Sequence, residues 1–285
     1  MNENREEIFA TREKYVRKLD DSLTGRVFHL AMDDGEDYEL RFVSGDIVEW
    51  RRPGEKLRYE KYGCFRVDET TYFLSSILAG HDPLICVTLV LDELQSLVTM
   101  AVSRQGYYPL RPRLSVVEFT FGAIRVPDKP LPVRRHGFTR DLVGKKITWH
   151  YATGFINTQM YPTERFCRIR PLTDIRTPEQ IAQEEREIEQ GLRPRQLLYE
   201  EPASYIKIKD GVYLLSFIES NMNRVDESKG GNNLMFVANF NAGIDYGRTF
   251  SRKADFKLDH GFFIAYGEEN FEVIPLETEE SPYRV

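Results

Sequence analysis

Two short segments of this chain carry residues whose types and spacing could transfer a proton to or from a small molecule. Alternate side chains of a β-strand point to the same face. In residues 147–151 (ITWHY), Trp149 and Tyr151 therefore share a face, and in residues 213–219 (YLLSFIE) the face of Tyr213 and Phe217 ends in Glu219. A carboxyl group at the end of an apolar inward face is a candidate general acid or base.

A carboxylate in apolar surroundings needs a partner, because burial without one costs free energy or forces protonation. Residues 165–170 (RFCRIR) offer such a partner, since Phe166, Arg168 and Arg170 share a face. If Phe166 points inward, Arg168 does too. In the alternative placement Glu219 ends its strand in solvent and the arginines face outward, and the pattern leaves both placements open. We take as candidate catalytic residues Glu219, Arg168 and Tyr151, and as candidate substrate-binding residues Trp149, Phe217, Tyr213, Phe166 and Arg170.

Other chemistry has little support in the sequence. The five histidines are dispersed without the spacing of metal ligands. The glycines at residues 230–231 precede no Gly-Lys-Ser/Thr and predict a hairpin turn, not a phosphate loop. No Gly-x-Ser-x-Gly nucleophile motif occurs. We therefore expect a site without metal or cofactor.

Composition favours a globular protein of the cytoplasm. A net charge of −6 argues against a nucleic-acid partner, because phosphate binding needs a basic face. The N-terminal residues contain no apolar run, so we expect neither a secretory signal nor a membrane segment. Three cysteines, odd in number and widely spaced, predict buried reduced thiols.

The first half predicts an antiparallel β-barrel or sandwich. Its short runs of β-branched and aromatic residues are broken by turn sequences such as DDG and RPG. Eight such runs at near-regular spacing match a closed all-β architecture better than an α/β fold. They cover residues 26–31, 38–43, 47–50, 59–67, 71–78, 85–91, 97–103 and 116–126. The proline-rich segment 126–133 marks the expected boundary between a domain at residues 1–128 and a second at residues 129–285.

The second half repeats the first. Residues 23–26 (LTGR) return as 142–145 (LVGK), residues 67–75 as 208–216, and residues 87–92 as 234–239, in the same order and at similar spacing. This agreement predicts a duplicated barrel. The first copy lacks the polar set, because residues 71–77 contain no carboxylate.

Two helices are expected beside the barrels. Residues 6–19 carry a loose apolar pattern that would lay a short helix against a barrel. Residues 177–190 predict a helix with Thr177 as N-cap, Pro178 in its first turn, Gln180 completing a capping box and Gly191 as its end. Because its apolar stripe is thin, this helix is either a solvated insertion, which we favour, or a lid over a barrel.

The second half resembles a known family. Residues 143–155 (VGKKITWHYATGF), 168–170 (RIR) and 208–219 (IKDGVYLLSFIE) resemble the phenolic acid decarboxylases in order and spacing. The chain from about residue 20 to residue 270 more diffusely resembles the MoaF-like family, named for molybdenum-cofactor biosynthesis. That resemblance implies two tandem lipocalin-like barrels of the calycin fold.

The decarboxylase resemblance also implies a site. In that family two tyrosines, an arginine and a glutamate line the barrel, and proton transfer yields a quinone methide that loses carbon dioxide. The second tyrosine matches Tyr151, the arginine Arg168 and the glutamate Glu219. The first tyrosine is replaced by Trp149, and the tryptophan before the glutamate by Phe217. An indole donates but does not accept, so these departures favour proton transfer in general over hydroxycinnamate decarboxylation.

The sequence therefore predicts a cofactor-independent lyase or isomerase that binds a small aromatic or conjugated acid in its second barrel. Glu219 would transfer the proton, Arg168 would orient Glu219 or bind an anionic group, and Tyr151 would hold the opposite end. Two alternatives remain, a non-catalytic binding protein of the calycin type and an accessory protein of molybdenum-cofactor metabolism. We expect a homodimer that binds neither nucleic acid nor membrane.

Overall fold

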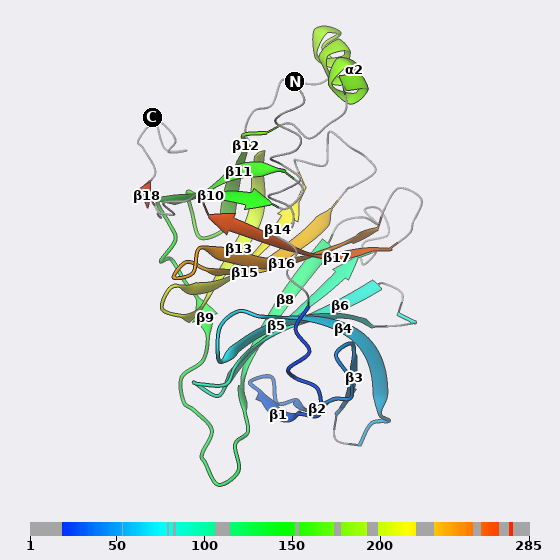
Figure 1. Ribbon diagram of the computed structural model, residues 1–285, viewed down its shortest axis with the longest axis vertical. Helices are drawn as coiled ribbons and strands as arrows, with labels where there is room; N and C mark the ends of the chain where they lie inside the picture. Colours follow the sequence, from blue (N-terminus) through cyan, green and yellow to red (C-terminus); the bar gives the residue numbers. More distant parts are fainter. Residues whose placement is uncertain are drawn as a thin grey trace.

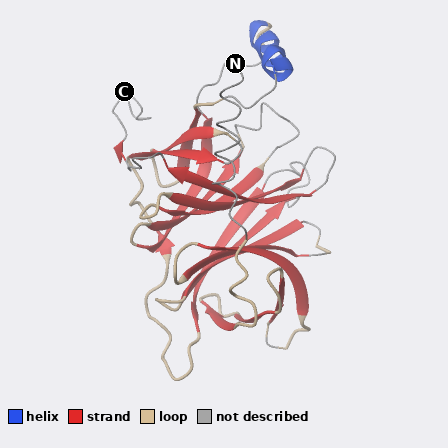
Figure 2. Ribbon diagram, viewed as in Figure 1, coloured by secondary structure: helices blue, strands red, loops and turns tan. Residues whose placement is uncertain are grey.

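The computed structural model describes residues 19–52, 54–78, 80–81, 84–105, 115–151, 154–173, 178–192, 199–220, 231–252, 258–267 and 274–275. Within these residues the chain forms two β-barrels, one above the other in Figure 1. Strands dominate the described part of the chain (Figure 2). The all-β prediction is confirmed.

The first barrel contains the eight strands predicted from the first half of the sequence. Each strand pairs antiparallel with the next, and pairing of Leu30 in β1 with Ile124 in β8 closes the barrel. Predicted and observed strand ends differ by at most two residues. The strands are β1 (Val27–Met32), β2 (Asp37–Phe42), β3 (Ile47–Arg51), β4 (Arg58–Arg66), β5 (Thr71–Leu78), β6 (Leu84–Asp92), β7 (Leu97–Gln105) and β8 (Ser115–Ile124).

The second barrel is closed by β10, which pairs with both β11 and β17. Its strands are β10 (Lys145–Tyr151), β11 (Ile156–Tyr161), β12 (Phe166–Pro171), β13 (Tyr199–Lys209), β14 (Val212–Glu219), β15 (Asn232–Asn239), β16 (Ile244–Arg252) and β17 (Leu258–Gly267). Two short strands add to it, β9 (Gly137–Phe138) beside β13 and β18 (Ile274–Pro275) beside β10. The prediction of two tandem barrels is confirmed.

The repeat in the sequence falls on equivalent elements of the two barrels. Gly25 and Gly144 both have φ near +80° and make the same turn. The N–H of Gly25 donates to the carbonyl of Phe42, and that of Gly144 to the carbonyl of Tyr161, each in the second strand of its barrel. The other two matches fall on the hairpins β4–β5 and β13–β14 and on strands β6 and β15. Strands β1 to β8 therefore correspond in order to β10 to β17.

Each barrel encloses an apolar core of alternate inward side chains. The first core includes Leu30, Phe42, Leu74, Leu89 and Met100, and the second includes Ile147, Trp149, Tyr161, Phe217 and Phe236. The three cysteines are free and fully buried, as predicted. The two cores take side chains from one face of β1 to β8, β10 to β15 and β17.

A third apolar cluster joins the barrels, because β4 to β8 pack their outer face on the outer face of β13 to β17 (Figure 1). It contains Phe65, Val67, Phe73, Val90 and Ala101 from the first barrel, and Ile206, Leu214, Met235, Val237 and Tyr246 from the second. A Cβ atom on Gly63 would stand 2.4 Å from the ring of Phe262, so the glycine makes room for that ring. The strands at this interface are therefore buried on both faces.

A buried arginine crosses the interface between the barrels. The guanidinium of Arg248 on β16 is fully buried. It donates to Thr88 Oγ1 at 3.1 Å, to Ser103 Oγ at 2.9 Å and to the carbonyl of Asn233 at 2.7 Å. No carboxylate of the described residues forms an ion pair with it, so hydroxyl and carbonyl oxygens from both barrels replace its hydration.

Helix α2 (Pro178–Glu189) confirms the second predicted helix. Figure 1 shows it apart from both barrels, an arrangement that favours a solvated insertion over a lid. Its predicted N-cap Thr177 and residues 6–18 of the first predicted helix lie outside the described residues. No helix in the described part of the chain is long and apolar enough to cross a bilayer.

Candidate functional site

The inward face of β10 carries Trp149 and Tyr151, as the alternation predicts. Trp149 is fully buried and stacks on Phe240, with ring centroids 6.1 Å apart. Tyr151 packs against the rings of Phe155 and Phe263 at 5.9 and 5.7 Å. An aromatic wall therefore surrounds the phenol at this end of the strand.

The inward face of β14 carries Tyr213, Phe217 and Glu219, also as the alternation predicts. Phe217 is buried and packs edge-on against Phe236. Glu219 is only 7% exposed, and its carboxyl group accepts a hydrogen bond of 2.9 Å from Asn232 Nδ2. Glu219 does not end its strand in solvent, so the alternative placement considered from the sequence is wrong for this residue.

The expected inward placement of Phe166, Arg168 and Arg170 is wrong. On β12 the inward residues are Cys167 and Ile169, both buried in the second core. Phe166 is 40% exposed, and Arg170 is exposed. Strand alternation fixes only which residues share a face, and here the cysteine and isoleucine form the wholly apolar face that the core selects.

Arg168 consequently contacts a different carboxylate from the one expected. Its Nε donates to Glu200 Oε2 at 2.9 Å on the outside of the barrel. The structure therefore brings together Tyr151, Trp149, Tyr213, Phe217 and Glu219 inside the second barrel, and leaves the three residues of β12 outside it.

Asp245 is an inward carboxyl group that sequence reasoning missed. It is fully buried, and neither carboxylate oxygen has a hydrogen-bond partner among the described residues. Burial raises the pKa of Asp245 well above its usual range, which favours the protonated acid. The alternation Asp245, Gly247, Thr249 was the available signal, but the opposite face of β16 carries the larger rings and looks more like a core face.

Tyr151 and Asp245 lie on one row of paired residues across three strands. Asp245 on β16 is opposite Ala265 on β17, and Ala265 is opposite Tyr151 on β10. On its other side Asp245 is opposite Ala238 of β15. Because directly opposed residues point to the same face, the carboxyl group and the phenol both point inward, with only methyl side chains between and beside them.

A chain of hydrogen bonds holds the Tyr151 hydroxyl. Gln159 Nε2 donates to Tyr151 Oη at 3.2 Å, and Gln159 Oε1 accepts from Tyr161 Oη at 3.0 Å. Burial raises the pKa of Tyr151 well above its usual range, and the nearby carboxyl groups of Asp245 and Glu219 act in the same direction. Tyr151 therefore remains a neutral phenol within electrostatic reach of both carboxyl groups.

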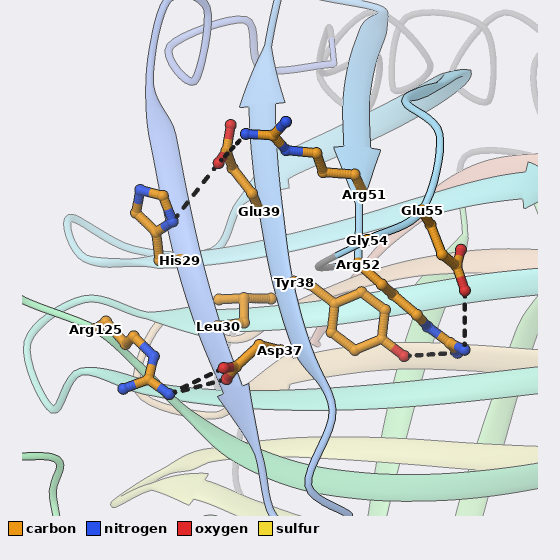
Figure 3. A pocket seen from close by; sticks show the side chains of 10 residues that line it. All are labelled: His29, Leu30, Asp37, Tyr38, Glu39, Arg51, Arg52, Gly54, Glu55 and Arg125. Carbon is orange, nitrogen blue, oxygen red and sulfur yellow. Dashed lines mark hydrogen bonds and ion pairs between the residues drawn. The ribbon is translucent and has the colours of Figure 1, made fainter.

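A separate hollow of about 300 Å³ lies on the first barrel (Figure 3). Its charged side chains pair with one another: Arg51 with Glu39 at 3.0 Å, and Arg125 with Asp37 at 2.9 Å. Arg52 donates to the hydroxyl of Tyr38 at 3.0 Å. Exposed pairs of this kind are common on protein surfaces, so the hollow is a weaker candidate than the interior of the second barrel.

The fold fits a calycin-like protein with two antiparallel barrels of eight strands, and the interior of the second barrel carries Tyr151, Glu219 and Asp245. A family model described as the MoaF N-terminal domain matches residues 9–106, which include β1 to β7. The MoaF-like resemblance is thereby confirmed for the first barrel, and the barrel fold of the second is consistent with the decarboxylase resemblance. A comparison with curated proteins finds no match to the chain.

Proposed function

We propose that the second barrel catalyses a cofactor-independent proton transfer on a small aromatic or conjugated compound, as a lyase or an isomerase. The observation that carries this proposal is that Glu219 and Tyr151 share an interior walled by aromatic side chains. A carboxyl group removed from water can exchange a proton with carbon more readily than one in water.

Each side chain has a separate role in this proposal. Glu219 transfers the proton, and its bond from Asn232 fixes one carboxylate oxygen. Tyr151 holds a polar group of the substrate, while Trp149 and Phe217 form apolar walls. Arg168 has no part in it, because its guanidinium pairs with Glu200 outside the barrel.

The test is turnover of a panel of hydroxycinnamic acids and related conjugated acids, aldehydes and ketones by the purified chain, followed by ultraviolet spectra and mass spectrometry. Loss of carbon dioxide identifies a lyase, and a product of unchanged mass that has taken up deuterium from heavy water identifies an isomerase. Glu219→Gln should lower the rate at least ~10²-fold, since it removes the proton-transferring group. Glu200→Gln, which changes an outer carboxylate, is the matched control.

Retention of the wild-type rate by Glu219→Gln would refute the assignment of the proton-transferring group. Recovery of every compound unchanged, with spectra perturbed by binding, would instead make this chain a non-catalytic binding protein.

A further inference from the structure

We propose that Tyr151 and Asp245 together donate hydrogen bonds to the carbonyl oxygen of a neutral conjugated ketone or aldehyde in the second barrel. This inference rests on the proposed function and narrows its substrate class. It assigns Asp245 a role as a hydrogen-bond donor to the substrate, and it separates the site from one built for a carboxylic acid.

The position of Asp245 is the first support. Its carboxyl group is fully buried without a hydrogen-bond partner among the described residues, and its neighbours on the paired row are Ala238 and Ala265. An unpartnered buried carboxyl group costs stability, because the hydrogen bonds that it makes to water in the unfolded chain are not replaced. A protein that keeps such a group, flanked by the smallest core side chains, has a place where a ligand group can supply the bond.

The first barrel provides an internal comparison. The paired row in the second barrel reads Tyr213, Ala238, Asp245, Ala265 and Tyr151. The equivalent row in the first barrel reads Tyr72, Leu91, Val98, Gly122 and Met32. Val98 replaces Asp245 and Met32 replaces Tyr151, and both are buried in an apolar core. The fold therefore requires neither the carboxyl group nor the phenol at these positions.

The hydrogen bonding of Tyr151 is the second support. Its oxygen accepts from Gln159, and no hydrogen bond from its own proton is found among the described residues. A phenol that accepts from an amide is a better donor, because the bonds of such a chain polarise one another. Asp245 in its protonated form is a second donor on the same row. A phenol and a neutral carboxyl group are a known combination for binding the oxygen of a forming enolate.

The charge of the interior selects a neutral ligand. Inward positions of the described strands include the carboxyl groups of Glu201, Glu219 and Asp245. The basic residues at inward positions of these strands are Lys145 and Lys207. Both lie near one end of the barrel, whereas Glu219 lies near the other end. Lys207 also forms an ion pair with Asp141 at 3.0 Å. Among the described residues, a carboxylate ligand beside Tyr151 would lie near further carboxyl groups and far from both lysines, whereas a ketone or aldehyde needs only hydrogen-bond donors.

The reaction step balances without a co-reactant. The Glu219 carboxylate takes a proton from the carbon next to the carbonyl group of the β,γ-unsaturated isomer of such a ketone or aldehyde. The C–H bond breaks, its electron pair forms the carbon–carbon double bond of a dienolate, and the carbonyl oxygen gains negative charge and is held by Tyr151 and Asp245. Glu219 then returns the proton to the γ carbon, which yields the conjugated isomer.

The test uses cinnamaldehyde and cinnamate, which share a skeleton but present a neutral carbonyl group or a carboxylate, and neither needs to react. Hydrogen bonds to the carbonyl oxygen shift the ultraviolet band of cinnamaldehyde to the red and lower its carbonyl stretching frequency. We expect the full chain to bind cinnamaldehyde with both shifts and to bind cinnamate at least about tenfold more weakly, since the carboxylate of cinnamate would lie among the inward carboxyl groups of the barrel.

Four variants separate the roles. Asp245→Val, the residue of the first barrel, should abolish most of both shifts, and Tyr151→Phe should do the same. Asp245→Asn should retain most of them, because an amide is a neutral donor, and Glu219→Gln should retain them because it acts on carbon, not on the oxygen. Unchanged shifts in Asp245→Val, loss of the shifts in Asp245→Asn, tighter binding of cinnamate, or failure of cinnamaldehyde to bind would each overturn the inference.

The outcome also separates this inference from the proposed function. If the ultraviolet and carbonyl shifts of cinnamaldehyde depend on Asp245 but no compound is turned over, Tyr151 and Asp245 are the hydrogen-bond donors and the proposed catalysis is wrong. Turnover of conjugated acids with cinnamate bound more tightly than cinnamaldehyde would support catalysis and reject the neutral substrate class.

Discussion

His260 should make the stability of this protein depend on pH between about 7 and about 4. It lies on the interface face of β17, with its Nε2 3.3 Å from Ser75 Oγ of the first barrel and its ring edge-on to Phe262. Burial, together with the nearby charge of Arg248, lowers the pKa of His260 from its ordinary value of 6.5 to about 4. Protonation would place a second cation in the interface.

The sign and size of the effect follow from these two pKa values. Between them the unfolded chain binds a proton that the folded chain does not, so the free energy of unfolding falls as the pH is lowered from about 6.5 to about 4. At about 1.4 kcal/mol per pKa unit, the difference between 6.5 and about 4 amounts to a loss of about 3 kcal/mol.

The assay is urea unfolding of wild type and His260→Gln at several pH values across this range. Other groups titrate equally in both proteins, so the difference between their curves isolates His260. We expect the variant to lose about 3 kcal/mol less than wild type on acidification to about pH 4. His29→Gln, whose side chain is 55% exposed, should follow wild type. Parallel curves for wild type and His260→Gln would show that the imidazole is not desolvated at the interface.

Two further predictions concern the same interface and are measured by urea unfolding. Gly63→Val should lower the free energy of unfolding by about 1–3 kcal/mol, because its new Cβ atom overlaps the ring of Phe262. Gly137→Ala, whose new Cβ atom meets nothing within 4 Å, should lower it much less. Equal losses in the two variants would contradict the close packing at Gly63. Arg248→Ala should lower the free energy of unfolding by about 3–5 kcal/mol, because it leaves a cavity and unpaired oxygens, while Arg248→Met, which fills most of the cavity but leaves the same oxygens unpaired, should lower it by less. If the two Arg248 variants were equally stable, the volume of the side chain would contribute nothing to the packing of the interface.

Much of the fold could be predicted from the sequence because each strand is short and separated by turn residues. The eight strands of the first barrel, the second helix and the duplication are all observed as expected. Alternation also placed Trp149, Tyr151 and Glu219 inside the second barrel, because β10 and β14 each have one face whose apolar residues lead directly to these groups.

The errors arise where both faces of a strand look suitable for burial. On β12 the face of Phe166 was chosen over that of Cys167, although the phenylalanine lies on the surface. On β16 the rings of Tyr246 and Phe250 belong to the outer face and are buried by the first barrel, which concealed Asp245 on the inner face. On β16 alternation could not assign the faces, because a strand between two cores has no face that meets water.

The wall shared by the two barrels also bears on how the molecule opens. Amide protons of β14 and β15 are paired on both sides within a closed sheet, and both surfaces of that sheet are covered by apolar side chains. Their exchange with solvent requires the global opening of the chain, while β2 and β3, which have no second barrel against them, can exchange through smaller fluctuations. The amide protons of strands at the interface between the barrels should therefore exchange more slowly than those of strands far from it. The two barrels should also unfold together in one transition.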